Sequence, residues 1–124
     1  MSLRALHADT AWLVVIANAL VGAWAIGAHY RPALRHRALW PATVVAELLL
    51  VLQVVLGVSL VAIEDYEVAQ MHAFYGFVAL ASIGIIYSYR HQLADRRLLL
   101  YGFGGLFLMG LAIRAMTLNP VPIP

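Results

Sequence analysis

Four long apolar runs, separated by short polar segments, constrain this chain more than any other feature of its sequence. They cover residues 11–28, 40–63, 68–89 and 98–116. Each run is close to the ~20 residues that an α-helix, rising ~1.5 Å per residue, needs to cross a hydrocarbon core ~30 Å thick. A helix in lipid also satisfies its backbone hydrogen bonds internally. The pattern therefore predicts an all-α fold, an integral membrane four-helix bundle.

The segments between the runs are too short to form a separate soluble domain. We therefore expect one domain over residues 1–124 with up-down topology. Hydrophobic residues make up 64% of the chain and charged residues 11%, whereas soluble proteins are about 45–50% apolar and about 25% charged. The lipid bilayer is thus the expected surrounding. Because there is no cysteine, thiolate chemistry is excluded, and because all eight basic residues are arginines placed mainly in loops, nucleic acid is not an expected partner.

The charges of the loops predict an orientation. The first and third connections are basic and the second is acidic; the residues concerned are Arg31, Arg35, Arg37, Arg90, Arg96, Arg97 and, in the second, Glu64, Asp65 and Glu67. Since arginine-rich loops stay on the cytoplasmic side, both termini are expected on the outer side. The terminal NPVPIP segment is expected to run extended there. We expect a multi-pass protein of a bacterial plasma membrane.

Polar side chains within the apolar runs are the first functional candidates, because a charge at the centre of a spanning helix costs about 2.5–3.5 kcal/mol on insertion scales. They are Asn18, Glu47, Gln53, His72 and Arg114, and His7 stands just ahead of the first run. Asn18 and Gln53 are typical of hydrogen bonds between helices. Glu47 suits either a structural contact or a proton path.

His7 and His72 form the most specific pair. The first and third helices run in the same direction, so both imidazoles are expected at similar depth near the outer face. Two facing histidines can bind a haem iron axially. One turn deeper lie Ala11 and Gly76, which leave room beside the ligands. The predicted site is therefore a haem b held by His7 and His72, with Gly76 beside it and Arg114, together with Arg4, near the propionates.

Each of these residues also has a purely structural interpretation. His7 could lie in the membrane interface, bonded to water or headgroups. His72 could pair with Glu64 or Glu67, and Arg114 could extend to the interface. A second haem between His29 and His91 is a further alternative.

The segment LQVVLGVSLV, followed by MHAFYGFVAL, resembles the paired helices of the haem A synthase family, in which a Q-x-x-L-G helix precedes a histidine-bearing helix. Gln53, Leu56 and Gly57 match the motif, His72 matches the histidine that follows it, and His7 takes the place of the other histidine. That family has two four-helix halves, of which this chain corresponds to one. The resemblance implies haem binding rather than the synthesis of haem A.

Two functions follow as expectations. The first is a small haem b-binding membrane protein in electron transfer or haem handling. The alternative is a cofactor-free accessory or assembly subunit of a larger respiratory membrane complex, which would bind other membrane subunits. A transporter or channel is a weaker third interpretation, since no broken-helix pair or ring of charges is evident. The residues indicate no catalytic reaction, although the sequence leaves that question open.

Overall fold

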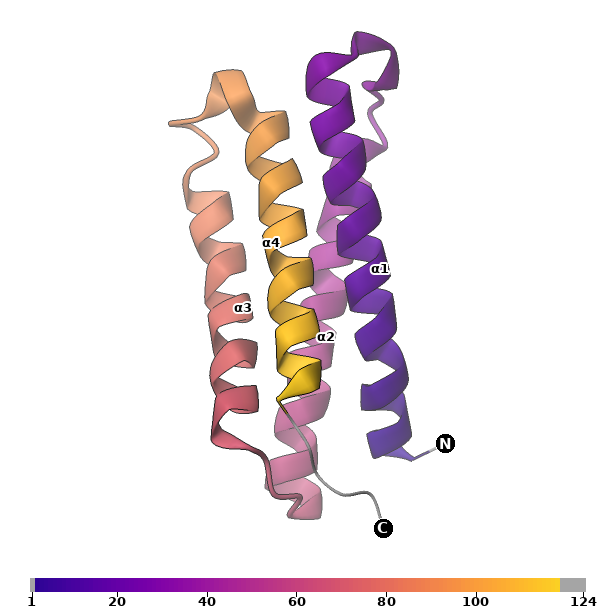
Figure 1. Cartoon of the computed structure of the whole chain (residues 1–124), viewed down its shortest axis with the longest axis vertical. Helices are drawn as coiled ribbons and strands as arrows, with labels where there is room; N and C mark the ends of the chain where they lie inside the picture. Colours follow the sequence, from indigo (N-terminus) through magenta and orange to yellow (C-terminus); the bar gives the residue numbers. More distant parts are fainter. Residues whose placement is uncertain (1, 119–124) are drawn as a thin grey trace.

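The computed structural model describes residues 2–118, in which all the regular structure is helical. Four long helices appear in chain order: α1 (Leu3–Tyr30), α2 (Leu39–Glu64), α3 (Gln70–Ser88) and α4 (Arg97–Thr117). Two short 3₁₀ helices, η1 (Pro32–Leu34) and η2 (Ala94–Arg96), lie in the connections. Figure 1 shows the four long helices side by side in an up-down arrangement. The all-helical class is confirmed, whereas the expected extended course of NPVPIP concerns residues outside those described.

All four long helices are long and apolar enough to cross a membrane. The bounds of α2, α3 and α4 lie within two residues of the predicted ones, whereas α1 begins eight residues earlier than residue 11. Ser2 explains the early start, because its hydroxyl accepts a hydrogen bond from the Ala5 N–H at 3.0 Å and so caps the helix. His7 therefore lies inside α1, in its second turn.

The ends of α1 and α2 are set by local backbone chemistry. Arg31 precedes Pro32 and is extended, as the residue before a proline prefers. At the end of α2, Asp65 has a left-handed backbone with φ of 57°, and the N–H of Tyr66 bonds to the Leu60 carbonyl at 3.1 Å. This arrangement satisfies carbonyls that the last turn would leave free.

Helix α4 lies in the middle of the packing, against α1 on one side and α3 on the other, while α2 packs mainly on α1. A Cβ added at Gly22 of α1 would lie 2.9 Å from the Gly102 carbonyl oxygen of α4, and one at Gly104 would lie 2.8 Å from the Ile86 side chain of α3. Small residues thus let the backbones of α1 and α4 approach closely, as is common in membrane bundles, and let the Ile86 side chain pack on the α4 backbone. On α4, Gly102 and Gly104 therefore lie at close contacts with neighbouring helices, whereas Gly110 faces open space.

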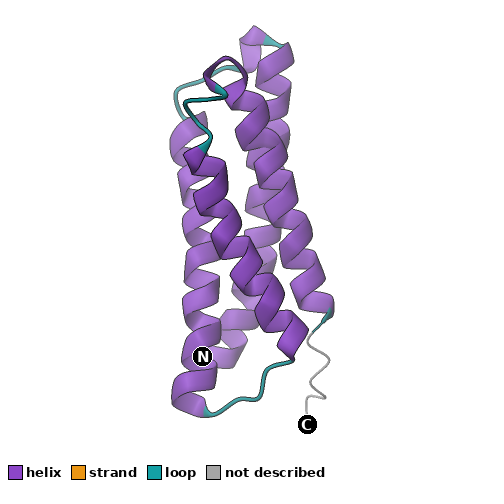
Figure 2. Cartoon of the chain, turned by 90° about the vertical axis from the view of Figure 1, so that its left-hand side faces the viewer, coloured by secondary structure: helices purple, strands orange, loops and turns teal. Residues whose placement is uncertain are grey.

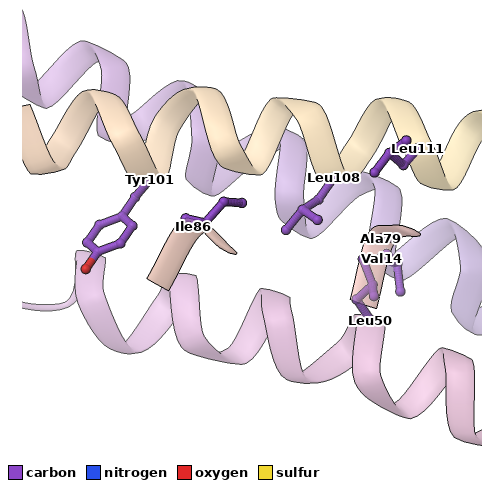
Figure 3. Packing of buried hydrophobic residues seen from close by; sticks show 7 residues of the cluster. All are labelled: Val14, Leu50, Ala79, Ile86, Tyr101, Leu108 and Leu111. Atoms are coloured by element: carbon purple, nitrogen blue, oxygen red, sulfur yellow. The ribbon is translucent and has the colours of Figure 1, made fainter. Parts of the chain in front are cut away.

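All four helices contribute to one cluster of buried apolar side chains. Figure 3 shows its members: Val14, Leu50, Ala79, Ile86, Tyr101, Leu108 and Leu111. Asn18 is also buried at 1% exposure, and its Nδ2 donates to the Ala46 carbonyl of α2 at 3.3 Å. The predicted role of Asn18 in a hydrogen bond between helices is confirmed.

The two ends of the bundle differ in charge. The connection between α2 and α3 lies at the end where α1 begins and α4 finishes (Figures 1 and 2). We call this the acidic end, after Glu64, Asp65 and Glu67. The opposite end carries the other two connections and their arginines, and we call it the arginine end.

Candidate functional site

His7 and His72 face each other at the acidic end. Their ring centroids are 6.3 Å apart and the ring planes make an angle of 72°. His7 comes from the second turn of α1 and His72 from the first turn of α3. Since α1 and α3 run in the same direction from this end, the two histidines meet although 65 positions separate them in the sequence. Both rings are half-buried.

His7 is held from α2 by Gln53 and Gly57. The Gln53 amide donates to the His7 carbonyl oxygen at 2.6 Å, and its own oxygen accepts a hydrogen bond from the Thr10 hydroxyl. A Cβ added at Gly57 would lie 3.1 Å from Cε1 of the His7 ring. Gln53 and Gly57 are one turn apart on the same face of α2, so one bonds the backbone of His7 and the other makes room for its ring. The predicted role of Gln53 between helices is confirmed.

His72 is oriented by α4. Its Nδ1 lies 2.6 Å from the Ala115 carbonyl oxygen. A carbonyl can only accept, so this contact is a hydrogen bond in the tautomer that carries a proton on Nδ1. Nε2 then bears the free lone pair. A hydrogen bond from one ring nitrogen to a backbone carbonyl is the usual support of a metal-ligating histidine.

The surroundings of His7 include an unpaired polar atom. Within residues 2–118, Nδ1 of His7 is buried and has no hydrogen-bond partner. A buried polar atom without a partner is unfavourable and uncommon in folded proteins. The two rings therefore offer nitrogen lone pairs in a partly dry environment.

The distance between the rings suits a single metal ion. A metal bonded to two imidazoles on opposite sides holds the centroids about 6 Å apart, because each metal–nitrogen bond is ~2.0–2.1 Å and each nitrogen lies ~1.1 Å from its centroid. Among the described residues, no group of three or more His, Cys, Asp or Glu side chains is placed to hold a metal. Zinc sites use three or four protein ligands, whereas a haem needs only two axial ones. The two histidine nitrogens thus match the axial ligands of a haem in number, whereas a zinc site would need at least one further protein ligand.

Space is available beside His72. A Cβ added at Gly76, one turn deeper on α3, would meet no atom within 4 Å. Ala11, the corresponding position after His7, is buried at 9% exposure, so the open space lies on the α3 side.

The charged residues expected around the pair also lie near this end, and within the described residues no hydrogen bond joins any of them to either ring. Arg114 directly precedes Ala115, whose carbonyl bonds to His72, so Arg114 lies at about the same depth as His72. Its exposed side chain leaves α4 about 100° around the helix axis from the direction of the Ala115 side chain. Arg4 lies over the Tyr66 ring, 5.4 Å from its centroid. Glu64 and Glu67 are exposed, and in the described part of the chain His72 bonds to the Ala115 carbonyl rather than to either of them.

Glu47 and the remaining histidines lie elsewhere. Glu47 is half-buried in α2, two turns deeper than Leu39. The ring of His29 lies edge-on to Tyr30 at 4.9 Å and His91 is exposed, both at the arginine end.

Three contributors to the site were not predicted in these roles. Gly57 follows Gln53 by four residues, so its helical spacing was a usable signal. Thr10 lies one turn after His7, so helical spacing could also have predicted that it lies beside His7. Ala115 acts through its backbone carbonyl, which every residue possesses, and no sequence pattern marks it.

Comparisons with protein-family models, with curated proteins and with solved structures found no match to this chain. The geometry of the two histidines is therefore the main basis for a functional proposal.

Proposed function

We propose that this protein binds haem b through His7 and His72 and acts in electron transfer or haem handling in a membrane. The observation that carries the proposal is the facing pair of imidazoles, with centroids 6.3 Å apart, supplied by two helices that run in parallel. A haem b bound there would supply a one-electron redox centre.

The chain's own residues would prepare the ligands before the cofactor binds. Gln53 and Gly57 set the position of His7, and the Ala115 carbonyl keeps the proton on Nδ1 of His72. Both effects reduce the reorganisation needed on binding. Gly76 leaves space beside His72, and Arg114, at the same depth, is the proposed partner of a propionate.

Two of these residues also match the motif that resembles one half of haem A synthase. Gln53 and Gly57 belong to the Q-x-x-L-G motif, and both contact His7. The motif would thus hold one ligand while the helix that follows carries the other. The proposed role is binding and electron transfer, without a catalytic reaction.

An absorption spectrum tests the proposal directly. We expect the full chain, produced with haem supplied and purified in mild detergent, to show a Soret band with the sharp visible bands of a bis-histidine haem. His7→Ala and His72→Ala should lose this spectrum, because each removes one axial ligand. His29→Ala and His91→Ala are the matched controls and should leave it unchanged.

Two results would contradict the proposal. One is a wild-type protein without a Soret band despite supplied haem. The other is a spectrum that His29→Ala or His91→Ala abolishes while His7→Ala and His72→Ala retain it, which would place the haem at the arginine end.

The exposure of α3 favours a second candidate function. Only Ala79, Ser82 and Ile86 of this helix are buried, and large apolar side chains cover its outer side: Met71, Phe74, Phe77, Leu80 and Ile85. Such a face suits contact with lipid or with another membrane subunit. An accessory subunit of a respiratory complex in a bacterial plasma membrane would use it for docking. Copurification from mild detergent tests this candidate, and elution as a lone, stable monomer would count against it.

A further inference from the structure

A groove at the arginine end lies between α3 and α4, away from the histidine pair. It is shallow and open to the surroundings, with a volume of about 470 Å³, and among the residues that line it are Ile86, Leu93, Arg96, Leu99, Phe103 and Phe107. The walls are apolar except at the mouth, where Arg96 stands immediately before α4. We propose that this groove binds an anionic phospholipid, with one acyl chain against the apolar wall and the phosphate at Arg96.

The length of the groove fits one acyl chain. Phe107 lies 11 residues beyond Arg96, which at ~1.5 Å per residue is about 16 Å along α4. This is about half of a hydrocarbon core ~30 Å thick, so the groove spans one leaflet. At the floor, Gly104 packs directly on the Ile86 side chain of α3, so α4 adds no side chain of its own there. An acyl chain of a phospholipid from that leaflet therefore matches both the depth and the apolar lining.

The positive charge of Arg96, at one end of the groove, favours a lipid with an anionic headgroup. Arg35 donates to the Ala28 and His29 carbonyls, and Arg90 donates to the Tyr87 carbonyl and lies over its ring at 3.8 Å. Within the described residues, the guanidinium of Arg96 makes no such hydrogen bond and is exposed. It is available to a phosphate, to which a guanidinium can donate two hydrogen bonds.

The carboxylate that precedes Arg96 in the sequence lies at another hollow. Asp95 lines a separate hollow together with His29, Arg35 and Arg97. Of the described residues that line the groove itself, none carries a carboxylate. A basic pocket between membrane helices at an arginine-rich surface is typical of anionic lipid sites.

Native mass spectrometry measures this selectivity. The full protein is placed in micelles that contain equal concentrations of palmitoyl-oleoyl phosphatidylglycerol and phosphatidylcholine. We expect about fivefold more phosphatidylglycerol retained, the ratio to which ~1 kcal/mol per basic residue near a surface corresponds. Arg96→Gln should remove the preference and Arg96→Lys should keep it. Arg37→Gln removes the same charge from the same end, outside the groove, and should leave the preference intact.

A second pair of variants tests the acyl chain. Leu99→Trp fills the groove and should lower the retention of both lipids, whereas Leu48→Trp, at an exposed position on α2, should not. Equal retention of the two lipids by the wild type would overturn the proposal. So would a preference that survives Arg96→Gln or falls equally in Arg37→Gln, since surface charge in general would then explain it. Retention unchanged by Leu99→Trp would also overturn it.

Discussion

Replacing Gly57 by alanine tests whether the His7 ring packs on α2. A Cβ at Gly57 would lie 3.1 Å from Cε1 of His7 and 3.7 Å from both ring nitrogens. The ring or the helix must then shift by a few tenths of an ångström. Adding a carbon to a filled site costs about 1–3 kcal/mol.

Gly76→Ala is the matched control, because it adds the same methyl group beside the other histidine where nothing lies within 4 Å. Alanine is favoured over glycine in a helix by ~1 kcal/mol at both positions. The propensity gain therefore cancels in the comparison, and the steric cost remains. We expect the free energy of unfolding of the Gly57→Ala variant to be about 1–3 kcal/mol lower than that of the Gly76→Ala variant. Titration with SDS in mixed micelles, followed by circular dichroism, measures the difference.

A double-mutant cycle assigns that cost to the imidazole. In a His7→Ala background there is no imidazole for the added methyl group to clash with, so Gly57→Ala should no longer lower the free energy of unfolding. The coupling free energy between the two substitutions should therefore be about 1–3 kcal/mol. Two results would refute the reasoning: equal stability of Gly57→Ala and Gly76→Ala, or a penalty that persists without the His7 ring. Either would mean that His7 is not held toward His72 by α2.

Three other predictions address the bundle. Gln53→Leu removes two hydrogen bonds to α1 and should lower the unfolding free energy by about 1 kcal/mol, since such bonds average ~0.6 kcal/mol in membrane proteins. Gly102→Ala places a Cβ 3.0 Å from backbone atoms of α1, so it should cost about 1–3 kcal/mol in the same titration. For orientation, single cysteines at Ser2 and Glu67 in this cysteine-free chain should react with an impermeant maleimide added outside, and one at His36 should not.

The two stability predictions each have a control. Gln92→Leu lies in an exposed turn and should leave stability nearly unchanged, whereas Gly110→Ala faces open space and should raise the unfolding free energy by up to ~1 kcal/mol through helix propensity alone. If Gly110→Ala proved as costly as Gly102→Ala, close packing of α1 on α4 would not be the cause. If the cysteine at position 36 were labelled from outside and those at positions 2 and 67 were not, the orientation would be opposite to the one expected from the arginines.

Local chemistry explains which features of the fold could be predicted. The spans of α2, α3 and α4 follow from apolar runs, because only a helix hides its backbone from lipid at that length. The start of α1 was missed because hydropathy ignores capping: Ser2 extends the helix over polar residues that no apolar pattern includes. Helix ends depend on side-chain hydrogen bonds, whereas an apolar run predicts only the central part of a helix.

The sequence by itself determined that four apolar helices form and that His7 and His72 lie near the same end, because helix direction alternates with each short connection. Only the tertiary structure decided that the two rings face each other, that Gly57 borders His7 and that the Ala115 carbonyl bonds to His72. The rotation of each helix about its axis produces these contacts. That rotation is set by packing, above all where α1 meets α4 at Gly22 and Gly102, and these apolar runs are too uniformly hydrophobic to encode it locally.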